Sequence, residues 1–301
     1  MESLKAILYF SIFNYPLNKD EIFKFSKTQK REDLVAELKE LESKKVIENV
    51  DGFYIYKDTA SIVKRRLTGN EHAKQVLPKA FKRAKFIAKF PYVESVSLSG
   101  GLSKGYYDDD GDFDFFIITK TKRLWIARTL LILYKKVFLR NNKKHFCVNY
   151  FISDQHLEIH EKNIFTATEL MTLIPVTGSA IFQKFMMHNT WPKSYLPNVT
   201  INNYEGIIEV KKPVLPRIIE AICHSKLGNM LEAFFRKVTL NKWKKKFTTL
   251  SKKELDIAMK STTDVSKHHP QNFQKKVINA LNKKYLEVKE KHEIILAPEH
   301  D

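Results

Sequence analysis

Hydrophobic positions in the first 57 residues follow helical spacing and then give way to short alternating runs. Asn18 in "YPLNKDEIFKF" is a candidate N-cap for a short second helix. The run "VIENVDGFYIY" holds two short β-patterns around Asp51-Gly52, which predicts a hairpin. The apolar stripes that predict the first and third helices are Leu4, Ile7, Leu8 and Ile12, and Leu34, Leu38 and Leu41. Helix, helix, helix, hairpin is the order of a winged helix, which we expect over residues 1–57.

In a winged helix the third helix is the one that would enter a DNA groove. Here it carries Lys30, Arg31 and Lys39 together with a larger number of acids, namely Glu32, Asp33, Glu37, Glu40 and Glu42. Acids at this position repel the phosphates that supply most of the affinity in such complexes. The sequence therefore favours a protein contact or dimerisation over DNA binding for this domain.

From residue 58 the pattern changes to a long basic helix and then to short strands. Residues 61–90 predict a linker helix, and the later apolar runs predict three strands with a helix among them. From Asn163 onward the pattern predicts helices separated by loops. The expected strands are Val93–Leu98, Phe113–Thr119 and 145–153 ("HFCVNYFIS"), and the expected helices are Arg123–Arg140 and Gln271–Lys289. Periodicity places Arg128 on the exposed face of its helix, as a phosphate contact or an ordinary surface charge.

Composition narrows the class of protein. The longest apolar run, 124–134, is interrupted by Arg128 and is far shorter than the ~20 residues that a bilayer requires. The N-terminus has no signal-peptide pattern, so neither a membrane span nor a membrane partner is expected. Two widely separated cysteines, Cys147 and Cys223, exclude a disulfide framework and fit a reducing cytoplasm, where we expect the protein to reside.

The charge balance is strongly and unevenly basic. The net charge is +18, and residues 211–301 hold 20 basic and 10 acidic side chains. A positive field attracts nucleic acid, nucleotides, acidic partners or anionic membrane, although lysines can also simply solvate helices. We expect nucleic acid or another polyanion to bind through this basic C-terminal region.

The chemistry concentrates in "SGGLSKGYYDDDGDFDFFIIT", residues 99–119. Asp112 and Asp114 stand at i and i+2 of a β-pattern, so both leave the same face of the strand while Phe113 leaves the other. Two carboxylates held in this way favour a cation between them, and hard divalent ions such as Mg²⁺ prefer such oxygen pairs. Gly100-Gly101 ends the preceding strand, where glycines allow backbone N–H groups to approach an anion.

The pattern Gly100-Gly101, then Ser103-Lys104, then Asp112-Phe113-Asp114 resembles the signature of the polymerase-beta-like nucleotidyltransferase superfamily. The likeness covers residues 93–152, and the whole chain also resembles a bacterial group that carries an N-terminal winged helix. It implies an α+β protein with a winged helix over 1–57, a small mixed-sheet nucleotidyltransferase core over 58–160 and a helical C-terminal domain over 161–301.

The resemblance also implies a function. A nucleoside monophosphate would move from a nucleoside triphosphate such as ATP to an acceptor, with release of pyrophosphate and with Mg²⁺ or Mn²⁺ as cofactor. Asp112 and Asp114 would be the catalytic metal ligands. The triphosphate would be held by Ser99, Gly100, Gly101, Ser103 and Lys104.

Two positions depart from the family pattern. Gly101 stands where the family usually has a serine, and Ser99 or Ser103 could substitute for it. Asn149 stands where the family usually has a third acid; its amide oxygen could bind metal but brings no charge and cannot serve as a base. Two hypotheses therefore stay open: an active enzyme, and a catalytically impaired regulator that binds nucleotide or nucleic acid.

Other candidate ligands have simpler interpretations. Asp108, Asp109 and Asp110 are interpreted as a solvated loop rather than as replacement ligands. His156 and His160 flank Glu158 without an obvious third metal ligand, so we interpret them as surface histidines.

Overall fold

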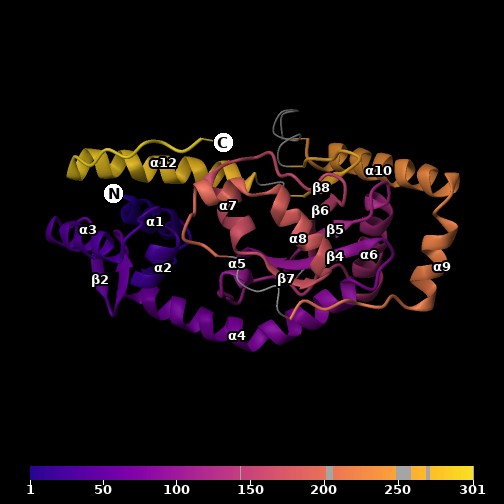
Figure 1. The fold of residues 1–301 in the computed structure, drawn as a ribbon, viewed down its shortest axis with the longest axis horizontal. Coiled ribbons are helices and arrows are strands. Elements are labelled where there is room, and N and C mark those ends of the chain that lie inside the picture. The colour runs from indigo at the N-terminus through magenta and orange to yellow at the C-terminus, as the bar shows by residue number, and fades with distance from the viewer. Residues whose placement is uncertain (143, 201–205, 249–258, 269–271, 301) are drawn as a thin grey trace.

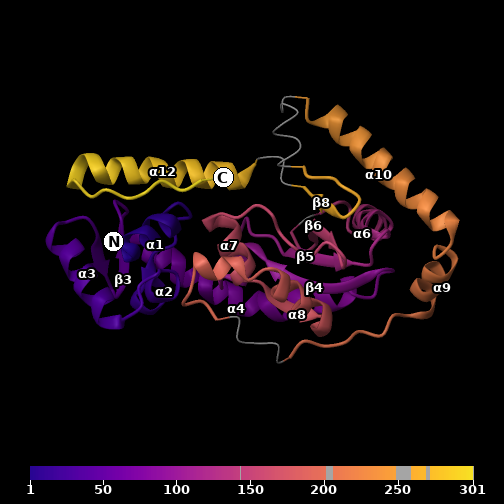
Figure 2. The same cartoon turned by 45° about the horizontal axis from the view of Figure 1, so that its top comes forward.

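The computed structural model describes residues 1–142, 144–200, 206–248, 259–268 and 272–300. The protein is a mixed α and β structure, with a cluster of N-terminal helices at one end and a five-stranded sheet at the other (Figure 1). Helix α4 (Ser61–Ile87) runs along one side of both parts, and α12 (Phe273–His292) lies along the N-terminal helices (Figures 1 and 2). No helix in the described part of the chain is long and apolar enough to cross a bilayer.

The N-terminal part contains the three helices and the hairpin that the sequence predicts. Asn18 caps the second helix, since its side chain accepts a hydrogen bond from the Glu21 amide while the Glu21 carboxylate accepts one from the Asn18 amide. Asp51 and Gly52 both have positive φ, 52° and 82°, and close the hairpin. The elements are α1 (Glu2–Ser11), β1 (Leu17–Asn18), α2 (Lys19–Lys24), α3 (Arg31–Ser43), β2 (Glu48–Val50) and β3 (Phe53–Ile55), with strand order β1-β3-β2.

Helix α12 completes the core of this N-terminal part. Helix α1 is buried on nearly every side, so it needs a partner beyond α2 and α3. That partner is the apolar stripe of α12, which packs into the same cluster as Leu4 and Leu8 through Val277, Leu281, Tyr285 and Val288. Helix α12 and the segment after it, as far as Leu296, therefore pack with the first 57 residues, whereas the sequence predicts that they belong to a helical C-terminal domain over 161–301. The described part of the final helix runs from Phe273 to His292; Gln271, its expected start, lies outside the described residues.

The central sheet is mixed, and it draws strands from outside the expected range 58–160. Its order is β7-β4-β5-β6-β8, with β5 and β6 parallel and the other neighbours antiparallel. The strands are β4 (Val93–Ser99), β5 (Asp114–Thr119), β6 (Cys147–Ser153), β7 (Ile174–Thr177) and β8 (Val265–Lys267). Strands β7 and β8 cover the two edges that β4 and β6 would otherwise leave unpaired. The sequence reading missed both because each is only three or four residues long.

Different helices cover the two faces of this sheet. Phe115 and Ile117 of β5 pack in a cluster with α4 and α6, whereas Phe116 and Ile118 pack with Phe182 and Phe185 of α8. The remaining helices are α5 (Gly100–Ser103), α6 (Leu124–Phe138), α7 (Ile164–Met171), α8 (Ser179–His188), α9 (Val214–Ile222), α10 (Lys226–Lys246) and the 3₁₀ turn η1 (Trp191–Ser194). Asp114 precedes Phe116 by two residues, so its carboxylate leaves the sheet on the α7–α8 side.

Helix α4 packs against both parts of the molecule, and its buried Arg66 contacts the N-terminal part. The Arg66 guanidinium lies 4.3 Å from the Tyr15 ring centre and 4.5 Å from that of Phe53. It also contacts Glu21 at 2.6 Å and donates to the Pro16 carbonyl. Further along, Ala80, Ala84 and Ile87 of the same helix pack on the sheet. The basic linker helix is therefore packed against both the N-terminal part and the sheet.

Candidate functional site

The turn after β4 brings backbone directly against Asp114. Ser99 pairs with Asp114 across β4 and β5, and Gly100 follows with φ of +69°. A Cβ atom at Gly100 would lie 2.5 Å from Asp114 Oδ2, so only glycine allows both the backbone conformation and this approach. Gly101 is less constrained, since a Cβ there would lie 3.3 Å from the Tyr106 carbonyl oxygen.

Ser103 and Lys104 fold back onto the same turn. Ser103 Oγ donates to the Gly100 carbonyl at 2.9 Å, and Lys104 Nζ donates to that carbonyl at 3.1 Å. Lys104 also forms an ion pair of 2.8 Å with Glu169 of α7. A ligand that used the Lys104 charge would therefore compete with Glu169 for it.

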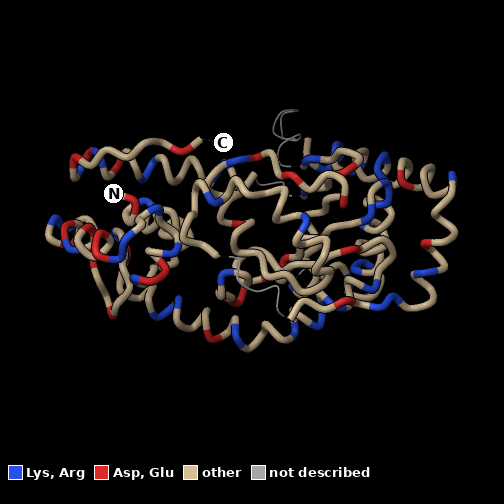
Figure 3. The backbone as a smooth tube through the Cα atoms, in the orientation of Figure 1, with Lys and Arg blue, Asp and Glu red and all other residues tan. Residues whose placement is uncertain are grey.

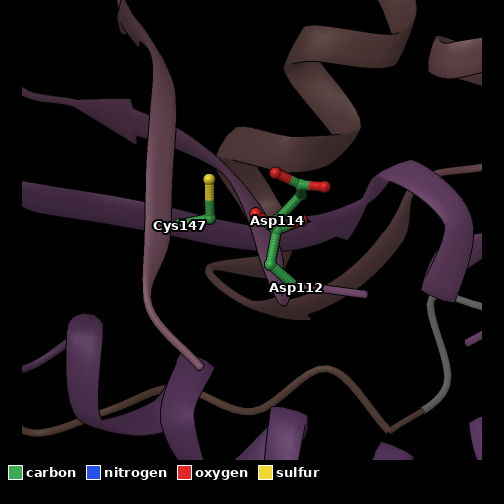
Figure 4. A group of neighbouring side chains, drawn as sticks. All are labelled: Asp112, Asp114 and Cys147. Atoms are coloured by element: carbon green, nitrogen blue, oxygen red, sulfur yellow. The ribbon is translucent and has the colours of Figure 1, made fainter. Parts of the chain in front are cut away.

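Two carboxylates and a thiol gather at the beginnings of β5 and β6 (Figure 4). One ligand atom from each of Asp112, Asp114 and Cys147 lies within 4.8 Å of the others. It is the one such group of three His, Cys, Asp or Glu side chains in the described residues. Asp112 and Asp114 thus come together as the sequence predicts, and Cys147 joins them.

Burial, together with the crowding of acids, shifts the protonation of this cluster. Burial, and next the negative charge of Asp112, raise the pKa of Asp114 to about 7. A hydrogen bond from the Cys147 thiol opposes that increase in part. Burial, followed by the charges of Asp114 and Asp112, raises the pKa of the Cys147 thiol, which keeps the sulfur protonated. A cation at this point would relieve the repulsion between the carboxylates.

Asn149 lies beside the acids as expected, but it presents its nitrogen to them. Its Nδ2 donates to Asp114 Oδ1 at 3.0 Å. The residue sits at a register shift between β5 and β6, where Phe115 pairs with Val148 and Phe116 pairs with Tyr150. To act as a metal ligand, the amide would have to turn its oxygen toward the carboxylates.

Sequence reasoning missed two residues of this site. Cys147 stands two residues before Asn149, so strand alternation alone places both on one face, but from the sequence Cys147 is interpreted only as evidence against a disulfide framework and for a reducing cytoplasm. Glu169 gave no local signal, because the packing of α7 brings it to Lys104 and lets its charge contribute to the raised pKa of Asp114.

The remaining candidates lie away from the cluster or have other partners. Asp108 pairs with Arg65 at 3.1 Å, and the Asp109 carbonyl accepts from Lys144 at 2.9 Å. His156 lies 3.2 Å from Asp264 and His160 lies 4.0 Å from Glu158, and both histidines are exposed.

Arg128 is neither a surface charge nor part of the site. It is buried between α6 and α10, with its guanidinium 4.8 Å from the centre of the Trp243 ring and 5.6 Å from that of Trp125. Burial lowers the pKa of Arg128 to about 10. The expectation of an exposed side chain was wrong because helix periodicity cannot account for a second helix that covers the outer face.

The donor set sets limits on what the cluster can hold. Two carboxylates suit hard divalent ions, whereas the Cys147 thiol favours softer ones. The backbone of the glycine turn lies directly against the Asp114 carboxylate. No family model matches the chain, and neither the curated proteins nor the solved structures gave a significant match.

Proposed function

We propose that the chain is a metal-dependent nucleotidyltransferase that moves a nucleoside monophosphate from a nucleoside triphosphate to an acceptor, with release of pyrophosphate. The observation that carries this proposal is the approach of Gly100 to Asp114. The backbone of a glycine turn, which we propose contacts the phosphates, lies directly against a pair of carboxylates able to hold a divalent cation. A triphosphate–metal complex needs both elements at one point.

Each residue has a distinct task in this proposal. Asp112 and Asp114 hold the cation, and the backbone from Gly100 to Ser103 borders the phosphates. Lys104 neutralises phosphate charge after it leaves Glu169, which keeps the lysine in position before substrate arrives. When bound, the divalent ion supplies charge stabilisation for the transferring phosphoryl group.

The surrounding architecture fits the same proposal in outline. We propose that residues 1–57 form a winged helix used for protein contact, since α3 bears more acids than bases. The mixed sheet serves as the nucleotidyltransferase core. A cytoplasmic location and Mg²⁺ or Mn²⁺ as the ion remain part of the proposal.

The test removes both carboxylate charges. We expect Asp112→Asn with Asp114→Asn to abolish the increase in melting temperature that Mg²⁺–ATP produces, and to abolish pyrophosphate release. Asp110→Asn is the matched control, because it removes an exposed acid from the preceding loop. Retention of the ligand-induced shift by the double variant would place the metal site elsewhere.

A second function, an impaired nucleotide-binding regulator, is favoured by the Asn149 contact. Its amide nitrogen already neutralises part of Asp114, in the place where the family pattern has a third acid. Asn149→Asp distinguishes the two functions. In an enzyme limited by the missing acid, turnover rises about tenfold or more, the equivalent of about 1.4 kcal/mol in the barrier. In a regulator no product forms, and Mg²⁺–ATP binds no better than before.

A further inference from the structure

Helices α9 and α10 carry an apolar face that packs against nothing in the described part of the chain. The two helices form one edge of the molecule (Figures 1 and 2). Val214, Met230 and Phe234 expose 70%, 69% and 57% of their surface. The full set of exposed large apolar side chains on these helices is Val214, Leu215, Ile218, Ile222, Leu227, Met230, Phe234 and Val238.

The spacing makes this set a continuous stripe rather than scattered residues. Positions 218 and 222 recur at four residues, and positions 227, 230, 234 and 238 recur at three or four. Other positions of α10 already supply its packing, since Leu231, Phe235 and Trp243 join the cluster that covers the sheet. Helix α10 is thus apolar on two faces, and only one of them has a partner within the described residues.

The acids of this segment are turned inward. Between residues 211 and 248 there are only two, Glu220 and Glu232. Glu220 accepts from the Tyr92 amide at 2.6 Å, and Glu232 accepts from the amides of Trp125 and Ile126 at 2.7 and 2.9 Å, where it caps α6. Both carboxylates therefore serve the packing of the helices on the sheet.

The cations of the segment remain outside. Figure 3 shows Lys and Arg spread over this edge of the molecule. The exposed ones are Lys211, Arg217, Lys226, Lys237, Lys242, Lys244, Lys245 and Lys246. The outer surface of α9 and α10 consequently combines large apolar side chains with cations and presents no exposed acid from residues 211–248.

We propose that the outer face of α9 and α10 binds the surface of an anionic membrane. A helix that is apolar on one face and rich in Lys and Arg beside it lies in the headgroup region, with its apolar side chains inserted and its cations near lipid phosphates. The expectation of no membrane partner rested on the lack of a spanning segment, which does not bear on contact with the surface. The charge of the face decides between occupants: a second copy would bring like charges together, and nucleic acid would leave the aliphatic side chains in water.

Binding to vesicles tests the proposal on the full chain. We expect the protein to co-sediment with phosphatidylcholine vesicles that contain about one third phosphatidylglycerol. With pure phosphatidylcholine vesicles, we expect the protein to remain in the supernatant. Ile218→Ser with Phe234→Ser removes apolar contact, and Lys244→Glu with Lys245→Glu removes charge. Each pair should weaken binding about tenfold or more.

Matched controls lie elsewhere on the surface. Met187→Ser removes an apolar side chain of α8 that is 74% exposed, and Lys289→Glu with Lys291→Glu makes the same change of net charge at the far end of α12. Both should bind vesicles like the wild type. Asp112→Asn with Asp114→Asn should also bind, because this proposal does not depend on nucleotide chemistry.

Four results would overturn the proposal. Two of them are no binding to anionic vesicles, and binding that both pairs of variants leave unchanged. Another is a dimer in light scattering that Ile218→Ser with Phe234→Ser converts to monomer, which would assign the face to a second copy. The last is binding of an RNA oligonucleotide that depends on Lys244 and Lys245, with no binding to vesicles.

Discussion

Two of the regions in which the protein buries charge have different surroundings. At the start of β5, Asp114 meets Asp112, and burial with this like charge raises its pKa to about 7. Between α6 and α10, Arg128 lies against two indole rings, and burial alone lowers its pKa to about 10. A buried carboxylate beside a second carboxylate favours a cationic ligand. A buried guanidinium between two indole rings is already stabilised by cation–π contacts. We therefore assign the first region to function and the second to the packing of α10 on the sheet.

The largest expected effect is on stability at the Arg128 region. Trp243→Ala should lower the free energy of unfolding by about 3–5 kcal/mol, because it removes a buried indole that covers Arg128. Phe234→Ala, an exposed aromatic on the same helix, should change it by no more than about 0.5 kcal/mol. Denaturant titration measures both.

Arg128→Met then tests whether that region has a function. Replacement of this buried charge by an apolar side chain of similar length is expected to be neutral or stabilising. Loss of nucleotide binding in this variant, with the fold retained, would contradict the assignment of Arg128 to packing.

The next effect is the pH dependence of stability that Asp114 produces without metal. Its folded pKa of about 7 lies above the value of 3.8 for a free carboxyl, so the folded state binds more protons in that window. Stability should therefore fall as pH rises from about 4 to 7, on the order of 2 kcal/mol for a side chain that is only partly exposed. Melting curves in a chelator should show this slope in the wild type and a flatter one in Asp114→Asn. Equal slopes would mean that Asp114 ionises normally.

The last comparison is between the stability costs of substituting the two adjacent glycines, Gly100 and Gly101. Gly100→Ala should cost about 1–3 kcal/mol and displace the Asp114 carboxylate, because φ is positive and the new Cβ would meet Oδ2 at 2.5 Å. Gly101→Ala meets only a carbonyl oxygen at 3.3 Å and should cost less than about 1 kcal/mol. Thermal melts with and without Mg²⁺–ATP check both, and similar losses of ligand response in the two variants would remove the special role of Gly100.

Local sequence patterns were enough to predict much of the fold and, within the candidate site, the pair Asp112 and Asp114. The capping of α2 by Asn18, the turn at Asp51-Gly52 and the shared face of Asp112 and Asp114 were all predictable. Each depends on residues within a few positions along the chain, where backbone geometry fixes the side-chain direction.

Tertiary packing decided the rest, since it brings together residues that no local pattern connects. The pairing of β5 with β6 placed Cys147 against the two acids, and the packing of α7 brought Glu169 to Lys104. Helix α12, from the far end of the chain, packs against α1 and completes its core. Strands β7 and β8 pair with the two edges of the three-stranded sheet β4-β5-β6. Arg128 became buried for the same reason. The sequence determined which faces of each element were apolar or charged, and only the tertiary structure decided which of those faces were covered, because burial depends on contacts between distant segments.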